Sequence, residues 1–204
     1  MTLNPIVFLR HLCLSLLLAG GALTASASPL NYHVDVDAST LAGSGYLDFF
    51  FGPTVSAAAA TATLTNFSPN FGPVDAGSSG DYTVGPNGSF SLSNGNGFNY
   101  LSRNVTLGGI LSFDVGFSGP FLGAIGDEDS IFSVALFDNT GFTVGNPDGI
   151  VQFSLVAGDP GTIVTTVDRE FATVTAAVPE PGQWLLMLTG LLAMGFIARR
   201  RASR

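Results

Sequence analysis

The chain has 204 residues, no lysine and a single cysteine, Cys13. Between residues 28 and 178, fourteen aspartates and glutamates stand against only Arg103 and Arg169, a net charge of −12 near neutral pH. Nucleic acid binding relies on lysine and arginine to neutralise phosphates, so this composition excludes DNA and RNA as partners. Because Cys13 lies in the leading apolar run, thiol nucleophiles and cysteine-based metal clusters are excluded from the rest of the chain.

Residues 1–27 predict a secretory signal peptide. Arg10 precedes the apolar run 12–19, and small residues follow that run. An uncleaved membrane anchor is the alternative, but the run is shorter than the ~20 residues that a membrane-spanning helix needs. We therefore expect cleavage at the site marked by Ala25, Ala27 and Ser28.

Residues 28–177 predict one all-β domain, because short runs of β-forming residues alternate with clusters of Gly, Pro, Asn and Asp. Tyr32 to Asp37 alternates strictly between apolar and polar residues, which is typical of a half-buried strand. Gly45 to Phe51 is a predicted core strand. Residues 57–64 combine alanines with alternating threonines, so both a helix and a strand are open, and we favour a strand.

Residues 66–88 are rich in Gly, Pro, Ser, Asn and Asp, and we expect a loop with one short strand at 81–84. The later part of the chain then supplies further strands. The total of nine or ten strands, at this spacing, favours a single jelly-roll-like antiparallel β-sandwich. The further strands are expected at residues 88–92, 99–107, 111–117, 131–137, 150–156 and 171–177.

The densest acidic cluster, Asp127, Glu128 and Asp129, is a candidate calcium site, because carboxylates on a glycine-bounded turn are hard oxygen ligands. The loops that carry Asp138 with Asn139, and Asn146 with Asp148, would add oxygens if they converged on it. The spacing of an EF-hand loop is absent, and solvated turn residues are the alternative. We expect no other cofactor.

The sequence marks no catalytic residue. His33 has Asp35 on the same strand face, but no G-x-S-x-G motif supplies a nucleophile, so an exposed strand histidine is expected. Paired carboxylates also serve glycosidases, yet fourteen acids make some pairing unavoidable. Carbohydrate platforms usually expose Trp or Tyr, so the phenylalanines at alternating positions are expected to fill the core.

The C-terminal residues 178–202 combine three elements in order. The proline-flanked motif is Val178, Pro179, Glu180 and Pro181, and its two prolines hold it extended and remove amide donors, so that a protease can grip it. An apolar stretch, Trp184 to Ala198, follows within a predicted transmembrane helix over 182–198. Its 15 apolar residues reach about 22 Å as a helix, short of a ~30 Å hydrocarbon core. The closing basic cluster, Arg199, Arg200 and Arg201, would stay on the cytoplasmic side.

These three elements resemble the PEP-CTERM sorting signal. The resemblance implies that Pro179, Glu180 and Pro181 are recognised by an exosortase-type membrane enzyme in a Gram-negative bacterium that makes extracellular polysaccharide. It also implies that the tail anchors the chain in the inner membrane before it is processed, with the body then at the cell surface or in the extracellular matrix. A plain C-terminal anchor with a chance Pro-Glu-Pro motif is the alternative. The front of the body, Tyr32 to Phe51, resembles an uncharacterised group of PEP-CTERM proteins, which brings no activity with it.

Three functions compete on this sequence. The first is a non-enzymatic envelope or matrix protein with a structural or adhesive role linked to exopolysaccharide. The second is a calcium-dependent carbohydrate-binding module, and the third is a hydrolase that uses His33. We expect the first, since an acidic, lysine-free and glycine-rich body suits a soluble surface module and nothing marks a nucleophile for the third.

Overall fold

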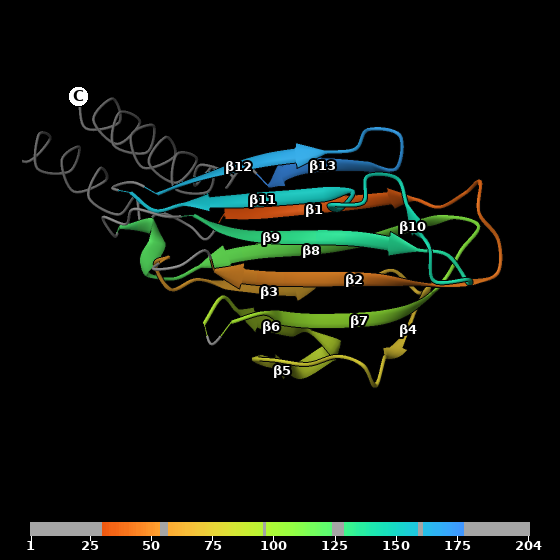
Figure 1. Cartoon of the computed structure of the whole chain (residues 1–204), viewed down its shortest axis with the longest axis horizontal. Helices are drawn as coiled ribbons and strands as arrows, with labels where there is room; N and C mark the ends of the chain where they lie inside the picture. The colour runs from red at the N-terminus through yellow and green to blue at the C-terminus, as the bar shows by residue number, and fades with distance from the viewer. Residues whose placement is uncertain (1–29, 54–56, 96, 124–128, 159–160, 178–204) are drawn as a thin grey trace, which may run out of the picture.

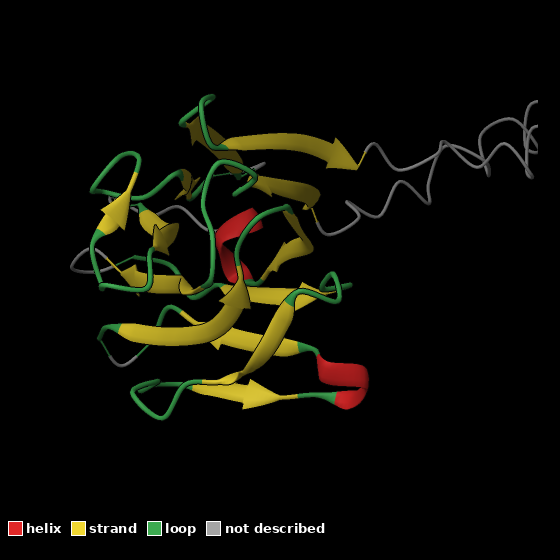
Figure 2. Ribbon diagram, turned by 90° about the vertical axis from the view of Figure 1, so that its right-hand side faces the viewer, coloured by secondary structure: helices red, strands yellow, loops and turns green. Residues whose placement is uncertain are grey.

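The computed structural model describes residues 30–53, 57–95, 97–123, 129–158 and 161–177. These residues form two stacked antiparallel sheets, a front sheet and a rear sheet in the view of Figure 1. Apart from two short 3₁₀ turns, η1 (Pro86–Gly88) and η2 (Pro120–Leu122), strands and loops make up the described chain, as Figure 2 shows. The predicted all-β sandwich is therefore confirmed.

The front sheet has the order β12-β11-β9-β2-β7-β4, and the short β10 pairs with β9. The rear sheet has the order β13-β1-β8-β3-β6-β5. The front strands are β2 (Ser44–Pro53), β4 (Phe71–Val74), β7 (Asn99–Thr106), β9 (Ser130–Phe137), β10 (Thr143–Val144), β11 (Val151–Val156) and β12 (Thr162–Val167). The rear strands are β1 (Leu30–Asp37), β3 (Thr61–Thr65), β5 (Tyr82–Val84), β6 (Phe90–Ser93), β8 (Ile110–Ser118) and β13 (Ala172–Ala177).

Alternation along the strands fills the space between the sheets. In β8 the odd-numbered residues from Leu111 to Phe117 are buried and the residues between them are only partly so, as the sequence pattern predicted. Aromatic rings meet across the two layers: the ring centroids of Phe49 and Phe113 lie 5.1 Å apart, and those of Phe117 and Phe132 lie 5.5 Å apart. Edge-to-face contacts of this kind add to the hydrophobic gain and hold the sheets in one register.

The described residues contain thirteen strands where nine or ten were expected, because β4, β10 and β12 were not predicted. β4 contains Gly72 and Pro73, which are turn signals in the sequence, and β10 is only two residues long. β12 is an edge strand whose threonines and valines are exposed or half-buried, so it lacks the pattern of a buried strand.

Residues 57–60 were expected to belong to a strand, but β3 begins only at Thr61. The side chain of Asn94 takes the place of a neighbouring strand here. Its Nδ2 donates to the carbonyl of Ala58 at 2.8 Å, and its Oδ1 accepts from the amide of Ala60 at 2.8 Å. A buried asparagine thus satisfies backbone groups that a sheet ladder would otherwise need to satisfy.

The two ends of the described chain lie side by side in the rear sheet. β1 begins at Leu30 and β13 ends at Ala177, and Asn31 is the register partner of Ala177. The segments predicted to be removed during export and sorting therefore join the sandwich at neighbouring strand ends.

Candidate functional site

A groove of about 560 Å³ lies on the outer face of the front sheet, where it crosses β7, β2 and β9. This size falls in the usual range for ligand sites. The register of the three strands places its residues in parallel rows across the sheet. The first row is Asn104, Tyr46 and Phe137, the middle row is Ser102, Asp48 and Ala135, and the third row is Tyr100, Phe50 and Ser133.

Asp48 and Ser102 of the middle row form the floor of the groove, and the aromatic residues of the rows on either side form its walls. Asp48 and Ser102 are buried, whereas Tyr46 keeps 37% of its surface exposed. Tyr46 and Phe50 are four residues apart on β2, so the two walls stand roughly 13 Å from each other.

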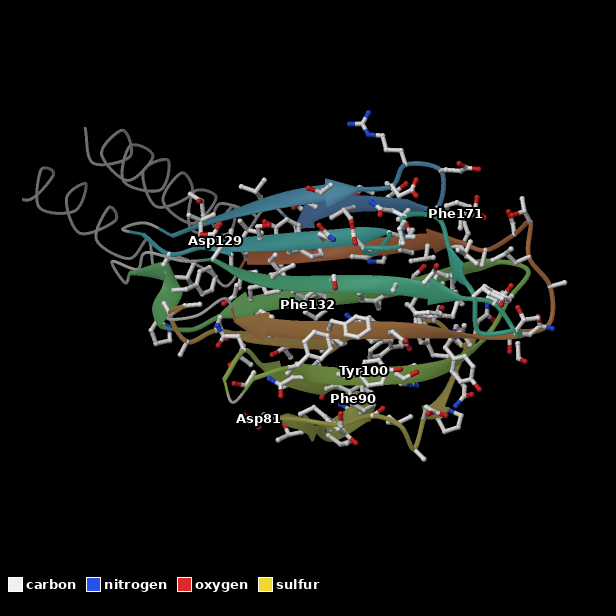
Figure 3. The ribbon with its side chains drawn as sticks, viewed as in Figure 1. Asp81, Phe90, Tyr100, Asp129, Phe132 and Phe171 are labelled. Carbon is white, nitrogen blue, oxygen red and sulfur yellow. The ribbon has the colours of Figure 1, made fainter. Side chains whose placement is uncertain are left out.

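The third row carries the larger aromatic surface. Phe50 packs against Tyr100 with ring centroids 5.0 Å apart, and against Phe98 with centroids 5.3 Å apart. Phe98 lies outside β7 and remains 68% exposed. The rings of Tyr100 on β7 (Figure 3) and of its two neighbours thus form a continuous apolar platform beside the floor.

Asp48 is the charged group of the floor and is only 5% exposed. Its Oδ2 accepts a hydrogen bond from the Tyr100 hydroxyl at 2.9 Å, and its Oδ1 accepts one from the Ser102 hydroxyl at 2.6 Å. Burial raises the pKa of the Asp48 carboxyl above its ordinary value; the two hydroxyl donors oppose this rise, and the negative charge of Asp75 adds to it. Burial is also the main cause of the raised pKa of Tyr100.

Asp75 stands at the rim of the groove, on the segment that follows β4. This segment runs along the free edge of β7: the Asp75 amide donates to the Ser102 carbonyl at 2.9 Å, and Ser79 exchanges two backbone hydrogen bonds of 2.9 Å with Tyr100. Ser78 adds its hydroxyl oxygen, which accepts from the Ser102 amide at 3.0 Å. The rim is therefore fixed by the same strand that supplies the floor.

Gly45 permits the close approach of β2 and β9 at the first wall. A Cβ atom at this position would meet the Phe137 carbonyl oxygen at 2.3 Å, far inside van der Waals contact. Only glycine allows Tyr46 and Phe137 to pair directly across the two strands at the wall.

The groove was not predicted from the sequence, because the phenylalanines were expected to fill the core. That assignment is correct for Phe49 and Phe51, which are fully buried, and wrong for Phe50 and Phe98. A signal was present: alternation along β2 places Tyr46, Asp48 and Phe50 on the face opposite Phe49. What the alternation could not supply was the strand pairing that brings Tyr100, Ser102 and Phe137 alongside them.

His33 lies on the outer face of the rear sheet between two carboxylates. Its Nδ1 is 2.6 Å from Asp114 Oδ1, and its Nε2 is 3.2 Å from Asp35 Oδ1. The hydrogen bond to Asp114 raises the pKa of His33; partial burial opposes this rise, and the charge of Asp35 adds to it. Ser112 donates its hydroxyl to Asp35 at 2.6 Å, so its hydrogen bond goes to the carboxylate rather than to the imidazole. The side chain is 48% exposed, which confirms the expected exposed strand histidine.

Of the three predicted calcium ligands only Asp129 lies within the described residues, and it does not converge with the other acidic loops. Asp127 and Glu128 lie outside the described residues, while Asp129 lies just before the start of β9 (Figure 3). Asp138 follows the end of that eight-residue strand, nine residues further along, so it is roughly 30 Å away. Asp138 Oδ1 accepts from the amides of Thr140 and Phe142 at 2.8 and 3.0 Å, and this side chain therefore closes its own turn.

Asn146 and Asp148 are likewise engaged in a local turn, where the Asp148 amide donates to Asn146 Oδ1 at 3.0 Å. Within the described residues, no group of three or more His, Cys, Asp or Glu side chains is placed to hold a metal ion. Calcium binding by Asp127, Glu128 and Asp129 stays a prediction.

The segments predicted to direct export and sorting lie outside the described residues, so their sites also stay predictions. None of the helical turns in the described ranges is long and apolar enough to cross a membrane. The sites concerned are Ala25, Ala27 and Ser28 at the leader, Val178, Pro179, Glu180 and Pro181 in the motif, and Arg199, Arg200 and Arg201 in the basic cluster.

Comparisons with protein-family models, curated proteins and solved structures give no match to this chain.

Proposed function

We propose that this chain is an exported protein of the cell envelope or extracellular matrix, whose sandwich makes adhesive contact with extracellular polysaccharide through the groove of the front sheet. The observation that carries the proposal is the pairing of aromatic walls with a polar floor. Sugar rings stack their apolar faces on aromatic side chains, while buried acceptors such as Asp48 take hydrogen bonds from hydroxyl groups. The contact is binding rather than catalysis.

Export and sorting belong to the same proposal. The leader 1–27 takes the chain out of the cytoplasm, and the tail 178–202 delivers it to an exosortase-type enzyme at the inner membrane. The PEP-CTERM resemblance of the tail supports this route. A polysaccharide-contacting body is the cargo that such a route implies.

The winding of the sandwich is proposed to be jelly-roll-like. Early strands pair with late ones in both sheets: β1 pairs with β8 in the rear sheet, and β2 pairs with β9 in the front sheet. Pairings between strands that are far apart in the sequence arise when a long hairpin folds over on itself, as in a jelly roll.

Substitution of the exposed groove aromatics tests the function. Tyr46→Ala and Phe98→Ala remove stacking surface from opposite walls, and each is expected to weaken binding about tenfold, or ~1.4 kcal/mol. The measurement is isothermal calorimetry of the full chain, in mild detergent, against a panel of neutral, acidic and amino polysaccharides. Ile110→Ala is the matched control, because Ile110 is 55% exposed on the rear sheet and distant from the groove.

Failure of the wild-type chain to bind any polymer of the panel would contradict the proposal. Equal losses in the Ile110→Ala control would contradict the assignment to the groove. Shorter oligosaccharides released during incubation would show catalysis instead of adhesion. Parallel titrations with calcium and with a chelator distinguish the calcium-dependent form of this function, since only that form loses binding when the metal is withdrawn.

A further inference from the structure

The groove carries negative charge without a basic side chain to balance it. Its lining in the described residues includes two carboxylates, Asp48 on the floor and Asp75 on the rim, and no Arg, Lys or His. Arg103 follows Ser102 on β7, but its side chain faces the core, where its Nε donates to the Gly72 carbonyl at 2.9 Å. The nearest arginine in sequence thus neutralises neither carboxylate, and a ligand with a positive charge would be electrostatically matched to the site.

The hydrogen bonds of Asp48 also favour a positively charged ligand. Both of its oxygens accept from hydroxyl groups, which orient the carboxylate but bring no charge. A carboxylate that is 5% exposed loses most of its hydration. An ammonium group placed over the floor would recover part of that lost electrostatic energy, and a neutral hydroxyl group recovers less.

The aromatic walls favour the same kind of ligand. Ammonium groups within about 6 Å of a ring centre are attracted by the negative face of the ring. Tyr46 on one side, and Phe50, Phe98 and Tyr100 on the other, offer such faces around the two carboxylates. Acidic sugars would be repelled by Asp48, by Asp75 and by the net charge of −12 on residues 28–178.

We infer that the polysaccharide partner of this groove carries protonated amines, as a hexosamine polymer does when its N-acetyl groups have been removed. This inference rests on the proposed function and narrows it to one class of sugar. The sugar rings stack on the aromatic walls, the floor accepts hydrogen bonds through Asp48, and an ammonium group lies between Asp48 and Asp75.

Three β-1,4-linked hexasaccharides provide the test, because hexamers of glucose, N-acetylglucosamine and glucosamine differ only in the group at C2. Calorimetry with the full chain at about pH 6 keeps the glucosamine amines protonated. We expect the glucosamine hexamer to bind at least about tenfold more tightly than the other two, and this advantage to shrink as salt is added.

Asp75→Asn should remove most of the advantage that the glucosamine hexamer has over the two neutral hexamers. Asp81→Asn is the matched control, because Asp81 is an exposed carboxylate beside β5 (Figure 3), outside the groove lining. Both variants remove one negative charge. A larger loss of affinity for the glucosamine hexamer in Asp75→Asn than in Asp81→Asn would therefore come from the position of Asp75 in the groove.

Equal affinities for the three hexamers would overturn the inference and leave polysaccharide contact standing. Binding of the neutral hexamers alone would also overturn the inference. An Asp81→Asn variant that loses as much of the glucosamine advantage as Asp75→Asn would overturn it too. If the chain binds none of the three hexamers and no polymer of the wider panel, the proposed function fails together with the inference.

Discussion

Asp48 shows what a single residue contributes to the groove and what it costs the fold. The raised pKa of its carboxyl means that the folded chain holds this proton more tightly than the unfolded chain, whose ordinary value is 3.8. The associated stability is fully present below 3.8, and it is lost as the pH rises through the higher value of the folded state. Ionisation of this carboxylate therefore lowers the stability of the folded chain.

Asp48→Asn removes this titration and is expected to change stability in a pH-dependent way. The melting temperature of the variant, relative to that of the wild type, should be higher at about pH 7 than at about pH 3. Thermal unfolding followed by circular dichroism at both pH values measures this difference. Asp81→Asn reports the effect of losing an exposed charge, and an Asp48→Asn difference that does not vary with pH would contradict the argument.

At the scale of elements, the buried cation Arg103 adds to the backbone pairing that joins β4 to β7 of the front sheet. Arg103 is 9% exposed; its Nε and Nη2 both donate to the Gly72 carbonyl, at 2.9 and 2.5 Å. Its guanidinium carbon lies 4.8 Å from the ring centre of Phe67, which is in the connection between β3 and β4. It lies 4.9 Å from the ring centre of Phe90, which is on β6 of the rear sheet. Burial lowers the pKa of Arg103, and the aromatic faces offset part of the cost of burying its charge.

Arg103→Met keeps much of the side-chain volume and removes these interactions, so it is expected to cost about 2–4 kcal/mol of unfolding free energy. Arg103→Lys should recover only part of this loss, because an ammonium cannot reproduce the planar fork. Urea unfolding gives the free energies, and hydrogen exchange of the β4 amides tests whether this strand loosens first. Thr106→Ala, at an exposed position of the same strand, is the control; a loss in that variant equal to the loss in Arg103→Met would contradict a special role for the arginine.

At the scale of the whole molecule, the chain combines a closed sandwich with two predicted processing segments. The core of aromatic and aliphatic side chains, from Val34 to Ala172, lies entirely between the junctions of these segments. Since Asn31 and Ala177 are register partners, the leader and the tail join neighbouring strands of the rear sheet. Removal of either segment would leave these strand pairings in place.

The mature protein recovered from its host is expected to begin at Ser28 and to lack the residues that follow the Pro179-Glu180-Pro181 motif. Intact-mass spectrometry of the cell-surface or matrix fraction measures both ends at once. A Glu180→Ala variant should retain the tail and accumulate in the inner membrane, while Arg204→Ala should be processed normally. Mature protein that still ends at Arg204 would contradict processing of the tail.

The sequence by itself determined the fold class and most of the strands, because period-2 alternation directly reports which residues face a core. The runs that became β1 and β8 show this pattern most clearly. It failed where other interactions replace the pattern: β4 depends on Arg103, and the backbone of residues 58–60 depends on Asn94. These partners are more than 30 residues distant, so no local signal marks them.

Only the tertiary structure decided where the candidate site lies. Alternation places Tyr46, Asp48 and Phe50 on one face of a strand, but it does not say which strands will flank them. The register of β2 with β7 and β9 brings Ser102 beside Asp48 and Phe137 beside Tyr46, from positions more than 50 residues away. A groove of aromatic walls over a carboxylate floor is a property of that pairing, since pairing across strands is set by the packing of the whole sandwich.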